Sequence, residues 1–166
     1  MWTCPHCGAE FVQENLSHSC GHFTVDAFLR GKSQRAIELF WFFIHSWNKV
    51  GAVKVHPVKT SVSLLVEVRF CRINRVTTAG ILGHLWLKER IISRKFFKVE
   101  KFRRNDYVHH FELKDESFID DEFLKYMKMS YEIGRRKHLE LAKDEPVDLR
   151  TTNRNEHVKW GSRKKQ

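Results

Sequence analysis

The sequence lacks the features that mark several large classes of protein. It contains no run of about 18 apolar residues, the length that a membrane-spanning helix requires. The segment from Met1 to Glu10 has neither the basic flank nor the apolar run of a secretory signal peptide. A phosphate-binding loop, a dinucleotide fingerprint, a Gly-x-Ser-x-Gly elbow and internal repeats are also absent. We therefore expect a cytoplasmic protein with no membrane partner, and the sequence gives no support for catalysis.

Acidic residues are scarce relative to basic ones. The chain has 20 Asp and Glu against 30 Lys and Arg, which gives a formal net charge of +10. Such an excess attracts polyanions, of which nucleic acid is the most abundant in cytoplasm. With 166 residues, of which 42% are hydrophobic and 13% aromatic, the chain is long enough for one ordinary domain and a small appended module.

Cysteine is also rare, and three of the four cysteines lie close to the N-terminus. Cys4 and Cys7 form a Cys-x-x-Cys knuckle, and Cys20 supplies a third thiolate for a tetrahedral zinc ion. The fourth ligand is His18 or His22, which lie two residues before and two residues after Cys20; we favour His18. Four protein ligands leave no open position for water, so we expect a structural zinc.

Behind this zinc ribbon, which we assign to residues 1–23, the hydrophobic pattern predicts an α+β domain over residues 24–142. Helices are expected at 25–29 after a Thr24 cap, at about 34–49 after a Ser33 cap, and from Asp120 to about Leu141. Strands are expected at 53–55, 61–73, 81–87, 96–102 and 107–113. We expect an antiparallel meander with helices on one face, a two-layer sandwich, followed by a mobile basic tail over residues 143–166.

Several short motifs resemble those of a bacterial family of domains of unknown function. They are the WTCPxCG start with a later HSCG, the TVDAFLRGKS stretch, HPVKT, HLWL and YVHHFEL. The resemblance covers about residues 1–139 and implies a zinc ribbon with an α+β domain behind it, with His18 among the zinc ligands. Related domains occur beside restriction-type nuclease modules, which implies a nucleic-acid setting. The same resemblance draws attention to Lys59, His84, His109 and His110.

The polar residues of the expected strands suggest a ligand site. If the sheet brings Lys59, Arg69, His84 and His110 together, they form a cationic pocket that suits a phosphate or carboxylate. His109 and His110 are adjacent in a strand, so their rings point to opposite faces and cannot bind one ion together; one of them is expected in the core.

The function we expect is that of a nucleic-acid-associated binding module with a structural zinc. The basic residues expected to contact phosphates are Arg30, Lys32, Arg35, Arg103, Arg104, Arg163, Lys164 and Lys165. One alternative is a small-anion or phosphate-binding domain that uses Lys59, Arg69 and His110. A third is a zinc ribbon that serves only as a protein docking piece.

Overall fold

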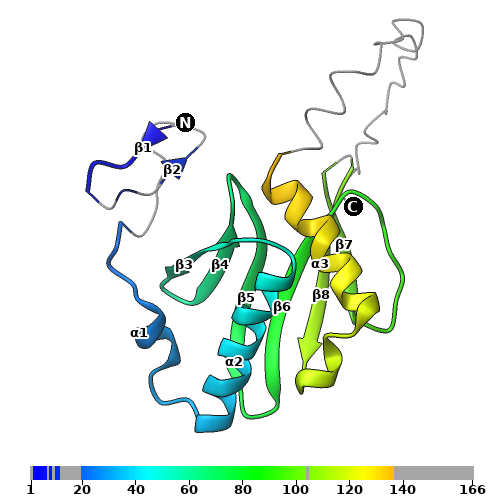
Figure 1. The fold of residues 1–166 in the computed structure, drawn as a ribbon, viewed down its shortest axis with the longest axis horizontal. Coiled ribbons are helices and arrows are strands. Elements are labelled where there is room, and N and C mark those ends of the chain that lie inside the picture. Colours follow the sequence, from blue (N-terminus) through cyan, green and yellow to red (C-terminus); the bar gives the residue numbers. More distant parts are fainter. Residues whose placement is uncertain (1, 7, 9, 12–19, 104, 137–166) are drawn as a thin grey trace, which may run out of the picture.

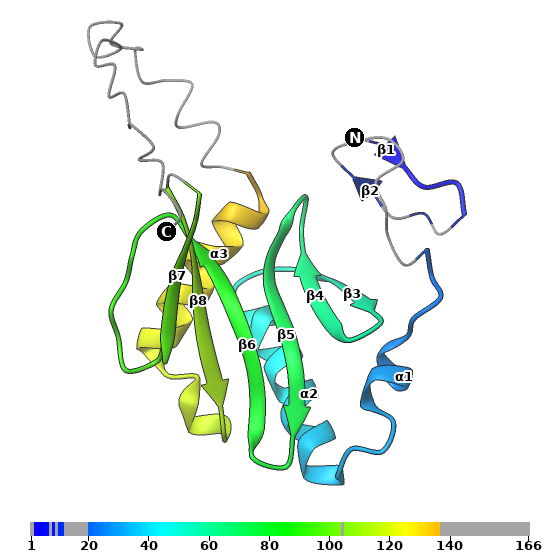
Figure 2. The ribbon, with the colours of Figure 1, turned by 180° about the vertical axis from the view of Figure 1, so that it is seen from behind.

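The computed structural model describes residues 2–6, 8, 10–11, 20–103 and 105–136. Helices lie against one face of a six-stranded antiparallel sheet (Figure 1), and the opposite face of the sheet is seen in Figure 2 with the helices behind it. The predicted α+β class and the placement of helices on one face are therefore confirmed. The elements of the main domain are α1 (Val25–Leu29), α2 (Gln34–Ser46), η1 (Trp47–Lys49), β3 (Lys54–Val58), β4 (Ser61–Leu65), β5 (Arg69–Thr77), β6 (Gly80–Leu87), β7 (Lys98–Arg103), β8 (Asp106–Leu113), η2 (Glu116–Phe118) and α3 (Asp121–Gly134).

Local capping explains where the first two helices begin. The Thr24 hydroxyl accepts a hydrogen bond from the Ala27 amide at 3.1 Å, and the Ser33 hydroxyl accepts one from the Ala36 amide at 3.3 Å. Gly31 separates the helices with a φ of +74°, a left-handed conformation that favours glycine. The apolar stripe of α2 lies in the core as its spacing predicts. Its buried members include Ala36, Phe40, Phe43 and Ile44, followed by Trp47 in η1.

Helix α3 begins as predicted but ends earlier. The Asp120 carboxylate accepts a hydrogen bond from the Phe123 amide at 2.9 Å, which caps the first turn. The helix ends at Gly134, and Arg136 has a φ of +59°, so the expected continuation to about Leu141 is wrong. Residues 137–166, which include the whole tail assigned to 143–166, lie outside the described part of the chain.

The predicted strand over residues 61–73 is in fact a hairpin. Strand β4 ends at Leu65 and β5 begins at Arg69, and the two strands pair antiparallel. The reversal is held by α3, because the amides of Glu67 and Val68 both donate to the Gly134 carbonyl, at 3.0 and 3.1 Å. The alternation of apolar and polar residues continues through this turn, so the sequence pattern does not reveal it. The carbonyl that holds the turn belongs to Gly134, which is remote in sequence.

The strand order is β3-β4-β5-β6-β8-β7, which corrects the expected meander. Strands β3 to β6 do follow one another, but β8 lies between β6 and β7. The connection over residues 88–97 carries the chain past the position of β8 to the sheet edge, and β8 then returns into the gap (Figure 2). Among the described residues, no helix is long and apolar enough to cross a membrane.

The two faces of the sheet differ in chemistry. The face toward the helices carries the core, with Phe70, Ile73, Leu85 and Phe111 fully buried. The adjacent residues His109 and His110 divide between the two faces as predicted: His109 is fully buried, and its Nε2 accepts a hydrogen bond from the Ile91 amide at 3.0 Å. The other face of the sheet, which we call the open face, carries the alternate residues of each strand, such as His110. The candidate site lies on this open face.

Candidate functional site

A pocket of about 500 Å³ opens where α1 and the β3–β4 turn meet strand β5. Four basic side chains line it, and no acidic side chain is among its lining residues. Its polar lining residues are Lys32, Lys59, Thr60, Ser61, Arg72, Asn74 and Arg75. We refer to this site as the cationic pocket. Three separate segments build it: α1 with Lys32 beyond its end, the β3–β4 turn with the start of β4, and the middle of β5.

The charges of the cationic pocket are not neutralised within the described part of the chain. None of its four basic side chains forms an ion pair there, whereas Lys88, Lys95 and Lys98 each lie beside a carboxylate. Arg72 donates from Nε to the buried Ser61 hydroxyl at 2.8 Å, which fixes the guanidinium by one edge. Its two terminal nitrogens make no hydrogen bond to any described residue. Four positive charges in one hollow favour an anionic ligand.

A row of polar residues runs across the open face from this pocket. Antiparallel register places one residue from each of the six strands side by side, so that their side chains share a face. In strand order, the row consists of His56, Ser63, Arg72, His84, His110 and Lys98. Arg72 belongs to both the row and the cationic pocket, so the two features are continuous.

His84 and His110 occupy the centre of the row, with ring centroids 5.4 Å apart. The Asn74 amide group donates to His84 Nδ1 at 3.1 Å, so neutral His84 carries its proton on Nε2. Burial, followed by the neighbouring His110 and Arg72, lowers the pKa of His84 to about 4. His110 donates from Nε2 to the Glu100 carboxylate at 2.6 Å. At neutral pH His84 is therefore uncharged at the centre of the open face. Beside it lies the hydrogen-bonded pair of His110 and Glu100.

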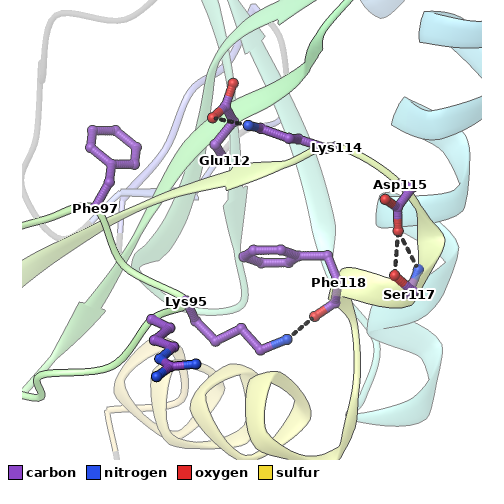
Figure 3. Close-up of a pocket in the computed structure, with 8 residues that line it drawn as sticks. Lys95, Phe97, Glu112, Lys114, Asp115, Ser117 and Phe118 are labelled. Atoms are coloured by element: carbon purple, nitrogen blue, oxygen red, sulfur yellow. Dashed lines mark hydrogen bonds and ion pairs between the residues drawn. The ribbon is translucent and has the colours of Figure 1, made fainter.

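A second pocket, of about 410 Å³, lies near the end of β8 and differs in its electrostatics (Figure 3). Its charged groups are largely engaged with one another or with the backbone. Lys114 pairs with Glu112 at 3.4 Å, and Asp115 accepts hydrogen bonds from the amide and hydroxyl of Ser117. Lys95 donates to the Phe118 carbonyl at 2.9 Å (Figure 3) and pairs with Asp120 at 2.7 Å. Among the described residues, Arg94 is the one charged side chain of this lining without such a partner, so the second pocket offers a single free cation where the cationic pocket offers four.

The residues expected to hold a small anion are divided by the fold. Lys59 lines the cationic pocket, but Arg69 and His110 are not among its lining residues. Arg69 lies at the start of β5, three residues before Arg72, and partial burial together with the Arg72 guanidinium lowers the pKa of Arg69. His84 and His110 do lie together, one strand beyond Arg72. The predicted trio of Lys59, Arg69 and His110 thus spreads over the open face rather than meeting in this pocket.

The expected nucleic-acid contacts also have different fates. Lys32 lines the cationic pocket, and Arg30 is exposed at the end of α1. Arg35 forms a two-pronged pair with Glu116, at 2.6 Å for both bonds, so its charge is already matched. Outside the described side chains lie Arg103, Arg104, Arg163, Lys164 and Lys165.

Sequence reasoning missed Arg72, Asn74 and Arg75. Their placement depends on a bulge in β5, which is visible only in the strand pairing. The register shifts between Ile73 and Arg75, which leaves Asn74 as an extra residue in β5 beside Arg75. No alternation rule places two consecutive side chains together in this way. The position of Arg72 follows only once β4 and β5 are recognised as a hairpin.

The expected metal ligands are described in part. Strands β1 (Trp2–Thr3) and β2 (Glu10–Phe11) form a two-stranded antiparallel pair. The sulfurs of Cys4 and Cys20 lie 3.7 Å apart, and Cys4 is buried. Gly8, with a φ of +67°, donates its amide to the Cys4 carbonyl at 2.9 Å and so closes a tight turn after the knuckle. Cys7 and His18 lie outside the described residues, and the alternative ligand His22 is exposed.

These features define a small α+β domain whose open sheet face carries a cationic pocket, and comparison of the sequence places the domain in a family. The chain belongs to the family described as Domain of unknown function (DUF5655), which matches residues 25–134. The match covers α1 to α3 and therefore the whole cationic pocket, but neither Cys4 nor Cys20. No curated protein and no solved structure matches the chain.

Proposed function

We propose that the protein binds nucleic acid through the cationic pocket, with a structural zinc holding its N-terminal segment. The observation that supports the first part is the gathering of Lys32, Lys59, Arg72 and Arg75 in one hollow without an acidic lining residue. Phosphate groups are the ligands that such a constellation attracts most strongly, and arginine favours them by its fork of N–H donors. The net charge of +10 adds a long-range attraction of the same sign.

The test is the salt dependence of binding to short DNA and RNA oligonucleotides, measured by fluorescence anisotropy. Lys59→Ala combined with Arg75→Ala removes two cations from the pocket, and both side chains are exposed, so the fold is preserved. If each contacts a phosphate, the slope of log K against log salt falls in magnitude by about 1.4 to 1.8. The matched control is Lys125→Ala with Lys128→Ala, which removes the same charge from the exposed side of α3.

The control separates local from general electrostatics. Equal losses in the two double variants would mean that net charge alone attracts the polyanion and that the pocket has no role. Failure of the wild-type chain to bind either nucleic acid at low salt would refute the proposed function outright.

The zinc part rests on the geometry of the two described thiols. A disulfide needs a sulfur–sulfur distance of about 2.05 Å. Two thiolates about 2.3 Å from one tetrahedral zinc lie about 3.75 Å apart, which agrees with the 3.7 Å between Cys4 and Cys20. Because the two sulfurs are 16 residues apart in sequence, a shared ion is the simplest reason for their approach. Cys7 with His18 or His22 would complete the site.

Metal analysis of the purified chain tests this assignment. We expect about one zinc per chain, lost in Cys20→Ser and retained in Cys71→Ser, since Cys71 is buried in the core of the main domain. Comparing His18→Ala with His22→Ala then identifies the fourth ligand. A zinc content that does not respond to Cys20→Ser would contradict the assignment.

A second candidate function is the binding of a small phosphate compound in the same pocket. The hollow of about 500 Å³ beside Arg72 favours this possibility, because a flat basic surface would offer a small ligand fewer contacts. Inorganic pyrophosphate distinguishes the two. Saturable binding of pyrophosphate, lost in the Lys59→Ala and Arg75→Ala variant, without any binding of oligonucleotides would favour the small ligand.

A further inference from the structure

The open face beside the cationic pocket is partly apolar and aromatic, which is unusual for a sheet face that none of the described helices covers (Figure 2). Half-buried Leu82, Trp86 and Val108 lie on it, on the same parity of β6 and β8 as His84 and His110. The rings of Trp86 and His84 meet edge to face at 4.7 Å. Phe97 lies next to His110, with centroids 5.9 Å apart, and is 63% exposed.

This aromatic patch and the cationic pocket share a boundary. Arg72 lines the pocket and pairs in register with His84, whose ring touches both Trp86 and His110. A ligand that enters the pocket with a negatively charged group therefore meets flat rings on the next strand. Among the charged groups facing the patch, Glu100 is matched by Lys98 and His110, at 2.7 and 2.6 Å.

We infer that this face binds a single strand of nucleic acid, with a phosphate in the cationic pocket and bases stacked on Trp86, His110 and Phe97. The inference rests on the proposed function and specifies the form of its ligand. A duplex offers a flat protein surface only its phosphates, because its bases are stacked on one another inside the helix. A single strand exposes charged phosphates and apolar base faces together, and the combination of basic groove and aromatic platform matches both.

The chemistry of the histidine pair fits this ligand. His84 is only 8% exposed and neutral, so it adds no charge at the centre of the patch, and its ring lies against those of Trp86 and His110. Asn74 and Glu100 hold the two histidine rings by hydrogen bonds at 3.1 and 2.6 Å, which reduces the entropy lost when a base stacks on His110. Such stacking tolerates any base, so we expect little sequence preference.

The test compares a fluorescein-labelled oligothymidine strand with a duplex of equal length, on the full chain. We expect tighter binding of the single strand, and Trp86→Ala weakens it between about 5-fold and about 100-fold, as loss of a stacking partner does. Trp86→Phe restores most of the affinity because it keeps a ring. Trp41→Ala is the matched control, since Trp41 is exposed on α2 in the helical layer.

A second variant guards against an effect on folding. Phe97→Ala removes a largely exposed ring next to His110 and therefore leaves the core unchanged. We expect it to weaken single-strand binding at least 5-fold with no loss of duplex binding.

The outcomes separate this inference from the function on which it rests. If single strand and duplex bind equally, and Trp86→Ala and Phe97→Ala behave like Trp41→Ala, the patch takes no part and only the phosphate contacts remain. If neither nucleic acid binds, both the proposed function and this inference are refuted, and a protein partner becomes the occupant to seek.

Discussion

Gly134 lies against the ring of Phe70 so closely that a β-carbon at position 134 would stand 2.3 Å from the Phe70 Cδ1 atom. The same glycine accepts, through its carbonyl, the amides of Glu67 and Val68. Ser130, one turn earlier on α3, donates its hydroxyl to the Phe70 carbonyl at 2.7 Å. The end of α3 therefore fixes both the β4–β5 turn and the start of β5.

Gly134→Ala should destabilise the protein because its methyl group meets a fully buried ring that has no room to move. We expect a loss of about 1 to 3 kcal/mol in the free energy of unfolding, measured by urea denaturation. Phe70→Leu offers a partner variant, since the smaller side chain relieves the overlap. A double variant whose loss equals the sum of the two single losses would show that the contact does not cause the effect.

His84 should make stability depend on pH. Its folded-state pKa of about 4 lies below the ordinary value of 6.5, so between these values the unfolded chain binds a proton that the folded chain does not. The free energy of unfolding therefore falls as the pH falls from about 6.5 towards 4, by on the order of 3 kcal/mol in full. Thermal unfolding followed from pH 7 to 5 should show a shallower decline in His84→Gln.

The control for this experiment is His45→Gln, since His45 is exposed on α2. It should follow the wild-type decline closely. Parallel curves for all three proteins would mean that His84 does not remain neutral in the fold.

Asp120 combines two roles that substitution can separate. It caps α3 through the Phe123 amide and pairs with Lys95 at 2.7 Å, and both contacts lower the pKa of its carboxyl. Asp120→Asn keeps an oxygen for the cap but loses the charge, whereas Asp120→Ala loses both. We expect Asp120→Ala to cost about 1 kcal/mol and Asp120→Asn clearly less, by chemical denaturation. Equal losses would assign the effect to the ion pair.

Cys71 should be the least reactive thiol of the chain. It is fully buried in the core, and burial raises the pKa of its thiol well above the ordinary value. After zinc is removed with a chelator, a thiol-specific reagent should therefore label the N-terminal cysteines first and Cys71 only as the protein unfolds. Cys71→Ser should abolish the slow phase of labelling; a slow phase that persists would place the protected thiol elsewhere.

The starts of the three α-helices followed from the sequence because their signals are local. Thr24, Ser33 and Asp120 lie within three residues of the amides they cap, and the stripe of α2 repeats at helical spacing. The β4–β5 turn could not be predicted, since the carbonyl that holds it belongs to Gly134. The place of β8 between β6 and β7 likewise depends on pairing between strands, which no single strand reveals.

Of the residues expected to form a basic pocket, Lys59 lines the cationic pocket, whereas Arg69 and His110 do not. Arg72 and Arg75, which line the same pocket, were missed because their position depends on the hairpin and on the β5 bulge. The pairing of His84 with His110 depends in turn on the β6–β8 contact.

The inserted position of β8 also sets an order of assembly during synthesis. Strands β3, β4, β5 and β6 lie side by side in sequence order, so they can begin to pair with one another while the ribosome still holds β8 and α3, whose Gly134 carbonyl secures the β4–β5 turn only later. The edge of β6 then stays unpaired until residues 106–113 arrive, and with them His110. A nascent chain halted before β8 would therefore hold the strands that carry Lys59, Arg72 and Arg75 without the half of the open face that carries His110.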